Sequence, residues 1–178
     1  MIYKELDKKH IYYIWRNIHL RCEKPKTNKK YISYVNCAVC DEWSVFDNFY
    51  NWYIKNFYQI PNQKMCVDKD VLCKNNKLYS PQTCCILPND INVLLTNRKS
   101  ERGDYPLGVY KKDKKYIAKC KYENKTIWIG SYDNVNDAFN AYKYKKEELI
   151  KKKANEYKLL LPQRIYEALL NYSIEITD

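Results

Sequence analysis

Two lysines at alternate positions give the chain its clearest candidate for binding chemistry. Lys119 and Lys121 lie in the run Tyr116-Ile-Ala-Lys-Cys-Lys. Side chains alternate between the two faces of a strand, so a strand here directs both lysines, with Ile117, to one face. The other face then carries Tyr116, Ala118 and Cys120. Such a strand could pack on a helix with one face and present cations to the phosphates of a nucleic acid with the other.

The charge of the whole chain also favours a polyanionic partner. Its 178 residues include 32 Lys and Arg against 21 Asp and Glu, for a formal net charge of +11. Each phosphate that a lysine neutralises releases condensed counterions, so a basic surface favours nucleic acid. The alternative is a soluble basic protein whose lysine excess reflects an AT-rich genome.

Cysteine is the second residue type whose side chain could bind a metal or react. The chain has eight cysteines, and Cys37-Ala-Val-Cys40 is the one short pair with metal-ligand spacing. Cys73, Cys84 or Cys85 would have to complete a zinc site, but adjacent cysteines rarely both ligate one tetrahedral zinc. The pattern therefore favours buried reduced thiols over zinc.

The elements that must position these residues follow from hydrophobic periodicity and turn signals. In the N-terminal half, apolar residues recur at spacings of three and four in two segments, and two later segments are rich in strand formers. Lys74-Asn-Asn-Lys77 predicts a turn, and Pro88 marks a helix start. The pattern predicts, in order, helices over 10–22 and 41–54, strands over 65–72 and 83–87, and a helix over 89–96.

The C-terminal half predicts three short strands and an amphipathic helix. The strands cover 108–110, 116–121 and 127–132, and the helix starts near Asp133 or Asn134 as N-cap. Ile127 and Ile129 take the helix-facing side of the third strand, so Trp128 falls on the cationic face. The lysine and glutamate run 143–153 extends the helix or forms a solvated face, and a short helix follows over 163–172.

In residue order this half resembles AP2-type DNA-binding domains. The resembling residues are Gly108-Val109, Ala118, Trp128-Ile-Gly130, and Ala138 to Tyr142. The resemblance implies a sheet that lies in the major groove, with Tyr110, Lys119, Lys121 and Trp128 on the contact face. Lys112 belongs to a basic hairpin loop that would grip phosphates. Tyr110 stands where the family usually has an arginine, and tyrosine cannot make the bidentate contact to guanine.

The N-terminal half resembles the HNH endonuclease-like proteins of bacteriophages, which often carry an AP2 domain. The resembling residues are Ile14 to Asn17, Arg21-Cys22, Val39 to Trp43, Phe46 to Tyr50, Val67 to Asp70, Asn76, Tyr79 to Cys84, and Asn92. The resemblance implies a ββα-metal fold that cleaves a phosphodiester with a divalent cation, Mg²⁺ or Mn²⁺. It places Asp68 on the strand and Asn92 on the helix as metal ligands, with Asn89 or Asp90 as rivals to Asn92.

The catalytic base is where the chain departs from this family. Lys69 stands at the position of the family's general-base histidine, and a lysine of ordinary pKa near 10.4 is protonated at neutral pH. Asp68 and Asp70 on either side of Lys69 fit a salt-bridged surface hairpin equally well. His10 and His19 lie in the predicted first helix, where a lone histidine is usually structural.

The sequence therefore predicts an α+β protein with three parts. An HNH-like ββα domain covers 1–99, an AP2-like three-stranded antiparallel sheet packed on a helix covers 103–157, and a helical tail covers 158–178, with the polar run 96–103 as linker. The expected function is that of a phage or mobile-element protein of the HNH endonuclease family that binds double-stranded DNA. Metal-dependent cleavage of the phosphodiester is left open, and Lys69 at the base position favours no efficient cleavage. The alternative is a catalytically degenerate factor that occupies DNA or a host protein, as a transcriptional regulator or counter-defence protein.

Two expectations concern where the protein acts. Residues 1–10 are charged and polar where a secretory signal would be apolar, which predicts a protein of the cytoplasm, that of the host cell if a phage encodes it. No run is long and apolar enough to predict a membrane span.

Overall fold

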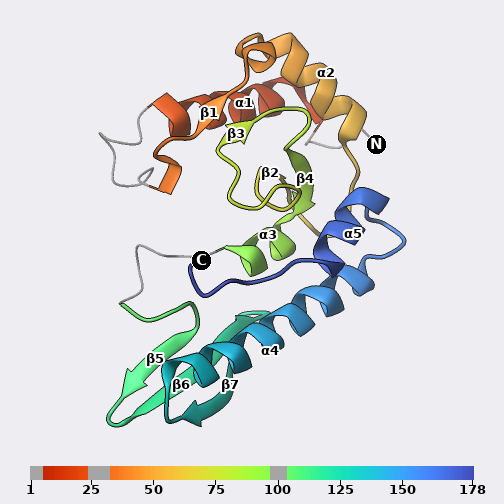
Figure 1. Cartoon of the computed structure of the whole chain (residues 1–178). Coiled ribbons are helices and arrows are strands. Elements are labelled where there is room, and N and C mark those ends of the chain that lie inside the picture. Colours follow the sequence, from red (N-terminus) through yellow and green to blue (C-terminus); the bar gives the residue numbers. More distant parts are fainter. Residues whose placement is uncertain (1–5, 24–32, 97–103) are drawn as a thin grey trace. The chain divides into compact units, whose positions relative to one another are not determined.

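The computed structural model describes residues 6–23, 33–96 and 104–178. Helices and three small sheets in these residues make a mixed α+β chain, as predicted (Figure 1). The chain divides into two compact units, Met1–Asn89 and Asp90–Asp178. The predicted three-part division into 1–99, 103–157 and 158–178 stays a prediction, and all but the first residue of the predicted linker lies outside the described residues.

Two helices and an aromatic core begin the first unit. α1 (Lys8–Glu23) confirms the first predicted helix, while the second is divided into a 3-10 turn, η3 (Asp41–Ser44), and α2 (Phe46–Asn56). The carbonyl of Trp43 explains the division, because it accepts a hydrogen bond from Trp15 Nε1 at 2.7 Å instead of from an amide one turn later. The Trp43 ring is fully buried and meets Phe49 edge-on, with 4.9 Å between the ring centroids.

Two small sheets complete the first unit. β2 (Met65–Asp68) pairs antiparallel with β4 (Cys85–Pro88), which confirms the two predicted strands, although the first ends four residues earlier than predicted. β1 (Ala38–Val39) pairs parallel with β3 (Leu78–Tyr79). This parallel pair was not predicted, because two-residue strands carry no readable alternation. α3 (Asn89–Leu95) follows β4 directly, so Pro88 ends a strand and the helix begins one residue later.

The second unit is built on a three-stranded antiparallel sheet with a helix on one face. The sheet has the order β5 (Val109–Lys112), β6 (Lys115–Tyr122), β7 (Lys125–Tyr132). α4 (Val135–Glu156) packs across it (Figure 1). Asn134, one of the two predicted candidates, is the N-cap, since its side chain accepts a hydrogen bond from the Asp137 amide at 2.9 Å.

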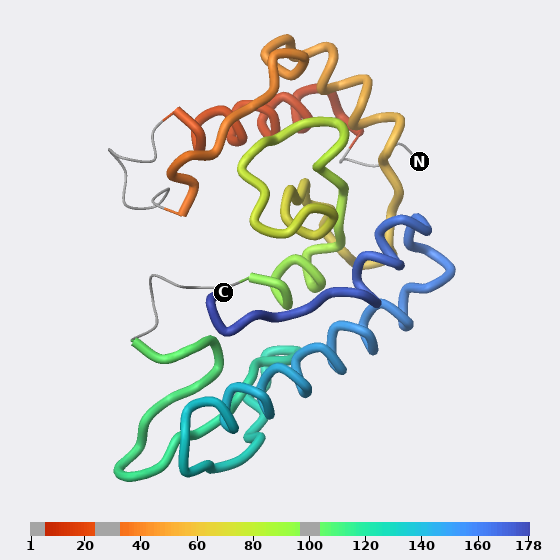
Figure 2. Tube along the Cα trace, viewed as in Figure 1, coloured from red at the N-terminus to blue at the C-terminus, as the bar shows by residue number. Residues whose placement is uncertain are grey.

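The C-terminal segment returns along α4. After α5 (Gln163–Leu170) the chain runs back beside the long helix (Figure 2). Lys143 Nζ donates to the Ile174 carbonyl at 2.7 Å, and Glu147 accepts from the Ile174 amide at 2.9 Å. Two hydrogen bonds from one helical turn thus fix the tail to the second unit.

Gly108, directly before β5, lies close to Tyr142 of α4, and this packing supports a prediction. Its φ is +76°, and a Cβ built there would lie 2.0 Å from the ring of Tyr142. Gly108→Ala therefore combines a strained backbone with overpacking, and we expect a loss of about 2–4 kcal/mol in the free energy of unfolding. Chemical denaturation measures it.

Gly130→Ala is the matched control for this change. A Cβ at Gly130 would meet the Tyr132 hydroxyl at 2.7 Å, and that hydroxyl is the tip of a side chain that can rotate. We expect a smaller loss, about 1 kcal/mol. Equal stability of Gly108→Ala and the wild type would contradict the described packing of Tyr142.

Candidate nucleic-acid interface and metal-ion site

The outer face of the β5–β7 sheet brings together three of the predicted DNA-contacting residues. Lys119 on β6 lies directly across from Trp128 on β7. On its other side, Lys119 Nζ lies 4.8 Å from the ring centroid of Tyr110 on β5. Trp128 is 60% exposed and Tyr110 is 50% exposed. The three side chains form a band across all three strands, which we call the outer band.

A β-bulge places Trp128 in the outer band. Ala118 pairs with Gly130 and Lys119 pairs with Trp128, so Ile129 is an extra residue on β7. Simple alternation would put residues 128 and 130 on one face, but the bulge moves Trp128 to the outer face while Gly130 opposes the buried Ala118. The prediction that Trp128 shares a face with Lys119 agrees with this pairing, although the strand is less regular than predicted.

The remaining predicted contacts surround the outer band. Lys121 is exposed and pairs with Thr126, and Lys112 is exposed and pairs with Lys115 near the hairpin turn. Lys115 forms an ion pair with Asp133 at 2.5 Å, which holds one side of that turn. Ile117 also belongs to this face by alternation, but it is buried, so the face is not made of cations alone.

Asp68, the predicted strand ligand, lies at the end of β2 and closes a turn. Its Oδ1 accepts hydrogen bonds from the amides of Asp70 and Val71, both at 2.8 Å. This turn explains why β2 ends at Asp68, because these amides bond to a side chain instead of a neighbouring strand. Burial raises the pKa of Asp68 above its ordinary value and outweighs the two hydrogen bonds, which lower it.

The Lys69 ammonium is bonded to groups other than the Asp68 carboxylate. Its ammonium donates to Asp70 at 2.5 Å and to the carbonyl of Asn76 at 2.8 Å, and Asn76 Nδ2 donates back to the Lys69 carbonyl at 3.0 Å. A salt bridge with Asp70 was one of the two predicted readings and is present. The lysine is only 7% exposed, so the ion pair is not the surface contact that was expected. These bonds fix Lys69 within the loop after β2.

The predicted helix ligands have different surroundings. Asn92 lies on α3 in the second unit, whereas Asp68 belongs to the first, so their pairing at a metal ion stays a prediction. Asn89 Oδ1 accepts from Cys66 Sγ at 3.6 Å. Asp90 accepts from the Tyr157 hydroxyl at 2.6 Å and lies 3.8 Å from Lys153 Nζ. Asp90 is therefore engaged within the second unit.

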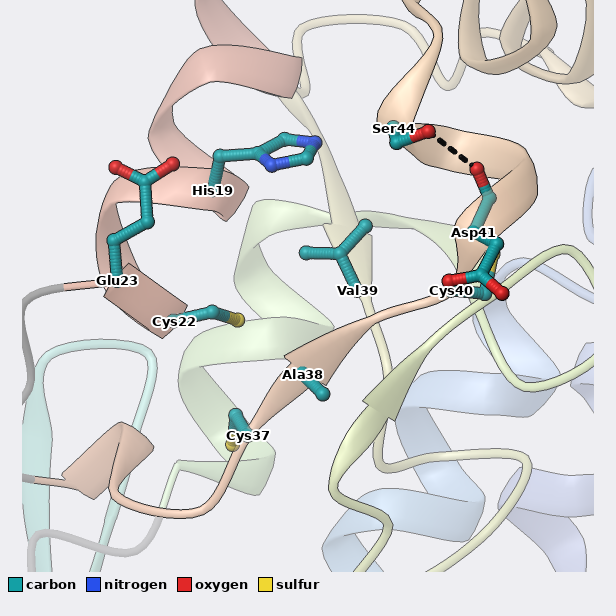
Figure 3. Close-up of a pocket in the computed structure, with 9 residues that line it drawn as sticks. All are labelled: His19, Cys22, Glu23, Cys37, Ala38, Val39, Cys40, Asp41 and Ser44. Carbon is teal, nitrogen blue, oxygen red and sulfur yellow. Dashed lines mark hydrogen bonds between the residues drawn. The ribbon is translucent and has the colours of Figure 1, made fainter.

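A pocket in the first unit is lined by residues that sequence reasoning did not combine. Cys37 and Cys40, the predicted half of a zinc site, share it with His19 and Cys22 of α1 (Figure 3). The sequence did contain a signal for this combination, because two residues separate His19 from Cys22, as two residues separate Cys37 from Cys40. Burial and the neighbouring Cys37 raise the pKa of Cys22 to about 11, so this thiol is protonated at neutral pH.

The Trp43 carbonyl also fixes His19 at this pocket. His19 Nε2 lies 3.1 Å from this oxygen, which can only accept, so Nε2 carries the proton of that hydrogen bond. Within the residues that the structure describes, no group of three or more His, Cys, Asp or Glu side chains is arranged to hold a metal ion. The cysteines that were expected to complete a site, Cys73, Cys84 and Cys85, do not line this pocket.

Comparisons with known proteins give no assignment. The chain matches no model of a protein family, and comparisons with curated proteins and with solved structures find no match either. None of the helices in the described ranges is long and apolar enough to cross a membrane. The resemblances to HNH and AP2 proteins therefore rest on the residues that carry them.

Proposed function

We propose that this protein binds double-stranded DNA through the outer face of the β5–β7 sheet. The observation that supports it is the composition of the three strands, which contain six lysines and no acidic residue. Strand register directs four of these lysines, Lys112, Lys115, Lys119 and Lys121, to the outer face. Two large aromatic side chains, Tyr110 and Trp128, lie exposed among these lysines. A cationic face with exposed aromatic groups offers phosphate contacts and base-edge contacts together.

The helix packed behind this face supports the sheet as a rigid surface for contact with DNA. α4 covers the opposite face of the sheet, and its buried side chains include Ala138, Phe139 and Tyr142. A two-stranded ribbon or a helix fits the major groove of B-DNA, and a small sheet backed by a helix can present its outer face there. The function proposed for the second unit is that of an AP2-like DNA-binding module.

Metal-dependent cleavage is the second candidate function. The observation that favours it is the orientation of Lys69, whose ammonium bonds to Asp70 and Asn76 and leaves the Asp68 carboxylate without a salt bridge from its neighbour. A half-buried carboxylate of this kind gains from a divalent cation. Because Lys69 occupies the position of the expected base, we propose binding as the principal activity, with inefficient cleavage or none. A binding protein without cleavage would regulate transcription or counter a host defence.

The test of DNA binding is the double variant Lys119→Ala/Lys121→Ala. We expect it to bind a labelled duplex at least about tenfold more weakly than the wild type, since each lost base-edge or phosphate contact weakens binding. Fluorescence anisotropy at fixed salt measures the Kd. The thermal midpoint should stay near that of the wild type, because Lys121 is exposed and Lys119 is partly exposed, and surface lysines contribute little to stability.

Lys145→Ala/Lys151→Ala is the matched control. It removes the same charge from α4, the layer behind the sheet. We expect it to change the Kd much less than the sheet variant does. If both double variants weaken binding equally, the attraction depends on net charge alone and the sheet face has no special role.

A further inference from the structure

The outer face lacks the side chain that most often reads guanine. The chain has no arginine between residues 104 and 163, which includes all three strands. Bidentate pairing of arginine with guanine O6 and N7 is the commonest specific contact in the major groove. The sheet must therefore distinguish bases by other means.

The outer band places an aromatic ring on each side of one lysine ammonium. Trp128 and Tyr110 lie on either side of Lys119, and Lys119 Nζ is held 4.8 Å from the Tyr110 ring centroid. Neighbouring strands are about 4.8 Å apart, so the band spans roughly 10 Å across the sheet, within the major groove's width of about 12 Å. The rings and the ammonium can thus face the same few base pairs.

Thymine matches this combination. Its C5-methyl group is the apolar feature of the major-groove edges, and the adjacent O4 accepts a hydrogen bond. An exposed ring can cover the methyl group while an ammonium donates to O4. On the basis of the DNA binding proposed above, we propose that the outer band reads thymine methyl groups, so that the protein prefers A·T-rich duplexes.

Replacement of thymine by uracil tests this proposal, because it removes the methyl group and keeps every hydrogen-bonding atom. The probes are one A·T-rich duplex and the same duplex with deoxyuridine at every thymine position. We expect the deoxyuridine duplex to bind about fourfold more weakly for each methyl group lost from an aromatic contact, and on the order of tenfold for two. Anisotropy titrations of the full chain at one salt concentration give both Kd values.

Two further arms assign the effect to the outer band. Trp128→Ala should reduce the ratio of the two Kd values toward one, whereas Lys145→Ala/Lys151→Ala should keep the wild-type ratio. In a G·C-rich duplex, 5-methylcytosine places a methyl group at the same groove position, so it should bind the wild type more tightly than cytosine does.

The outcomes separate this proposal from the proposed function. Equal affinity for thymine and uracil duplexes, with binding still strong and salt-dependent, would overturn methyl reading and leave DNA binding in place. Tighter binding to the G·C-rich duplex than to the A·T-rich one would also overturn it, in favour of guanine recognition by Lys119. Absence of binding to every duplex would overturn both.

Discussion

Raising the salt concentration from roughly 50 to 200 mM is expected to weaken binding of duplex DNA on the order of a hundredfold. The reason is the set of lysines that strand register places on the outer face, which are Lys112, Lys115, Lys119 and Lys121. If each of them neutralises one phosphate, the same number of condensed counterions is released, and the logarithm of the affinity falls linearly with the logarithm of the salt concentration. Anisotropy titrations at four or more salt concentrations give the slope.

The variants refine this prediction. Lys119→Ala/Lys121→Ala should reduce the magnitude of the slope by about one for each lysine that contacts a phosphate, whereas Lys145→Ala/Lys151→Ala should leave the slope near that of the wild type. An affinity that is unchanged over this salt range would show that phosphate contacts do not drive binding. The cationic sheet face would then need another ligand.

Asp68→Asn is expected to abolish any nicking of plasmid DNA that requires Mg²⁺ or Mn²⁺. The metal ion would supply most of the stabilisation of transition-state charge, because Lys69 is bonded to Asp70 and Asn76 and is not placed as a base. An amide keeps the acceptor for the Asp70 and Val71 amides, so the turn stays closed while the negative charge is lost. Asp68→Ala would remove these hydrogen bonds as well, which makes it the poorer test.

The stability of Asp68→Asn provides its control. Because burial raises the pKa of Asp68 in the folded state, the folded protein binds a proton more readily than the unfolded chain does. Ionised Asp68 therefore lowers stability as the pH rises above the ordinary carboxyl pKa and through the folded-state value. At pH 7 we expect Asp68→Asn to be at least as stable as the wild type in thermal unfolding.

The plasmid assay then decides between the two functions. Nicking by the wild type that disappears in Asp68→Asn would support a metal site at this turn. Full activity in Asp68→Asn, or cleavage without a divalent ion, would exclude Asp68 as the ligand. Binding without nicking by the wild type would support the factor that occupies DNA and does not cut it.

Local patterns in the sequence predicted most of the regular elements. α1, β6, β7 and the start of α4 follow from periodicities of 3.6 and two residues. An N-cap at Asp133 or Asn134 follows from their position before an apolar helical pattern, and the structure selects Asn134. The alternation in β6 also predicted that Lys119 and Lys121 lie on one face. These features depend on neighbours within a few residues, so one segment contains the whole signal.

Features that depend on distant contacts were not predictable in this way. The break at Val45 arises because Trp15 on another helix uses the Trp43 carbonyl. The bulge at Ile129 depends on pairing with the neighbouring strand, β6. In each case a hydrogen-bonding group has several partners available in the chain, and only the packed structure selects one.

The candidate sites also combine features that the sequence determined with features that only the tertiary structure decided. Residue types and spacing determined a strongly basic α+β chain with a lysine-bearing strand and a carboxylate beside Lys69. Tertiary structure alone decided that Lys119 lies between Tyr110 and Trp128 and that Lys69 points to Asp70 and Asn76. The physical reason is that alternation fixes only the face on which a side chain lies, whereas its neighbours on that face are set by strand register and by the turns that end each strand.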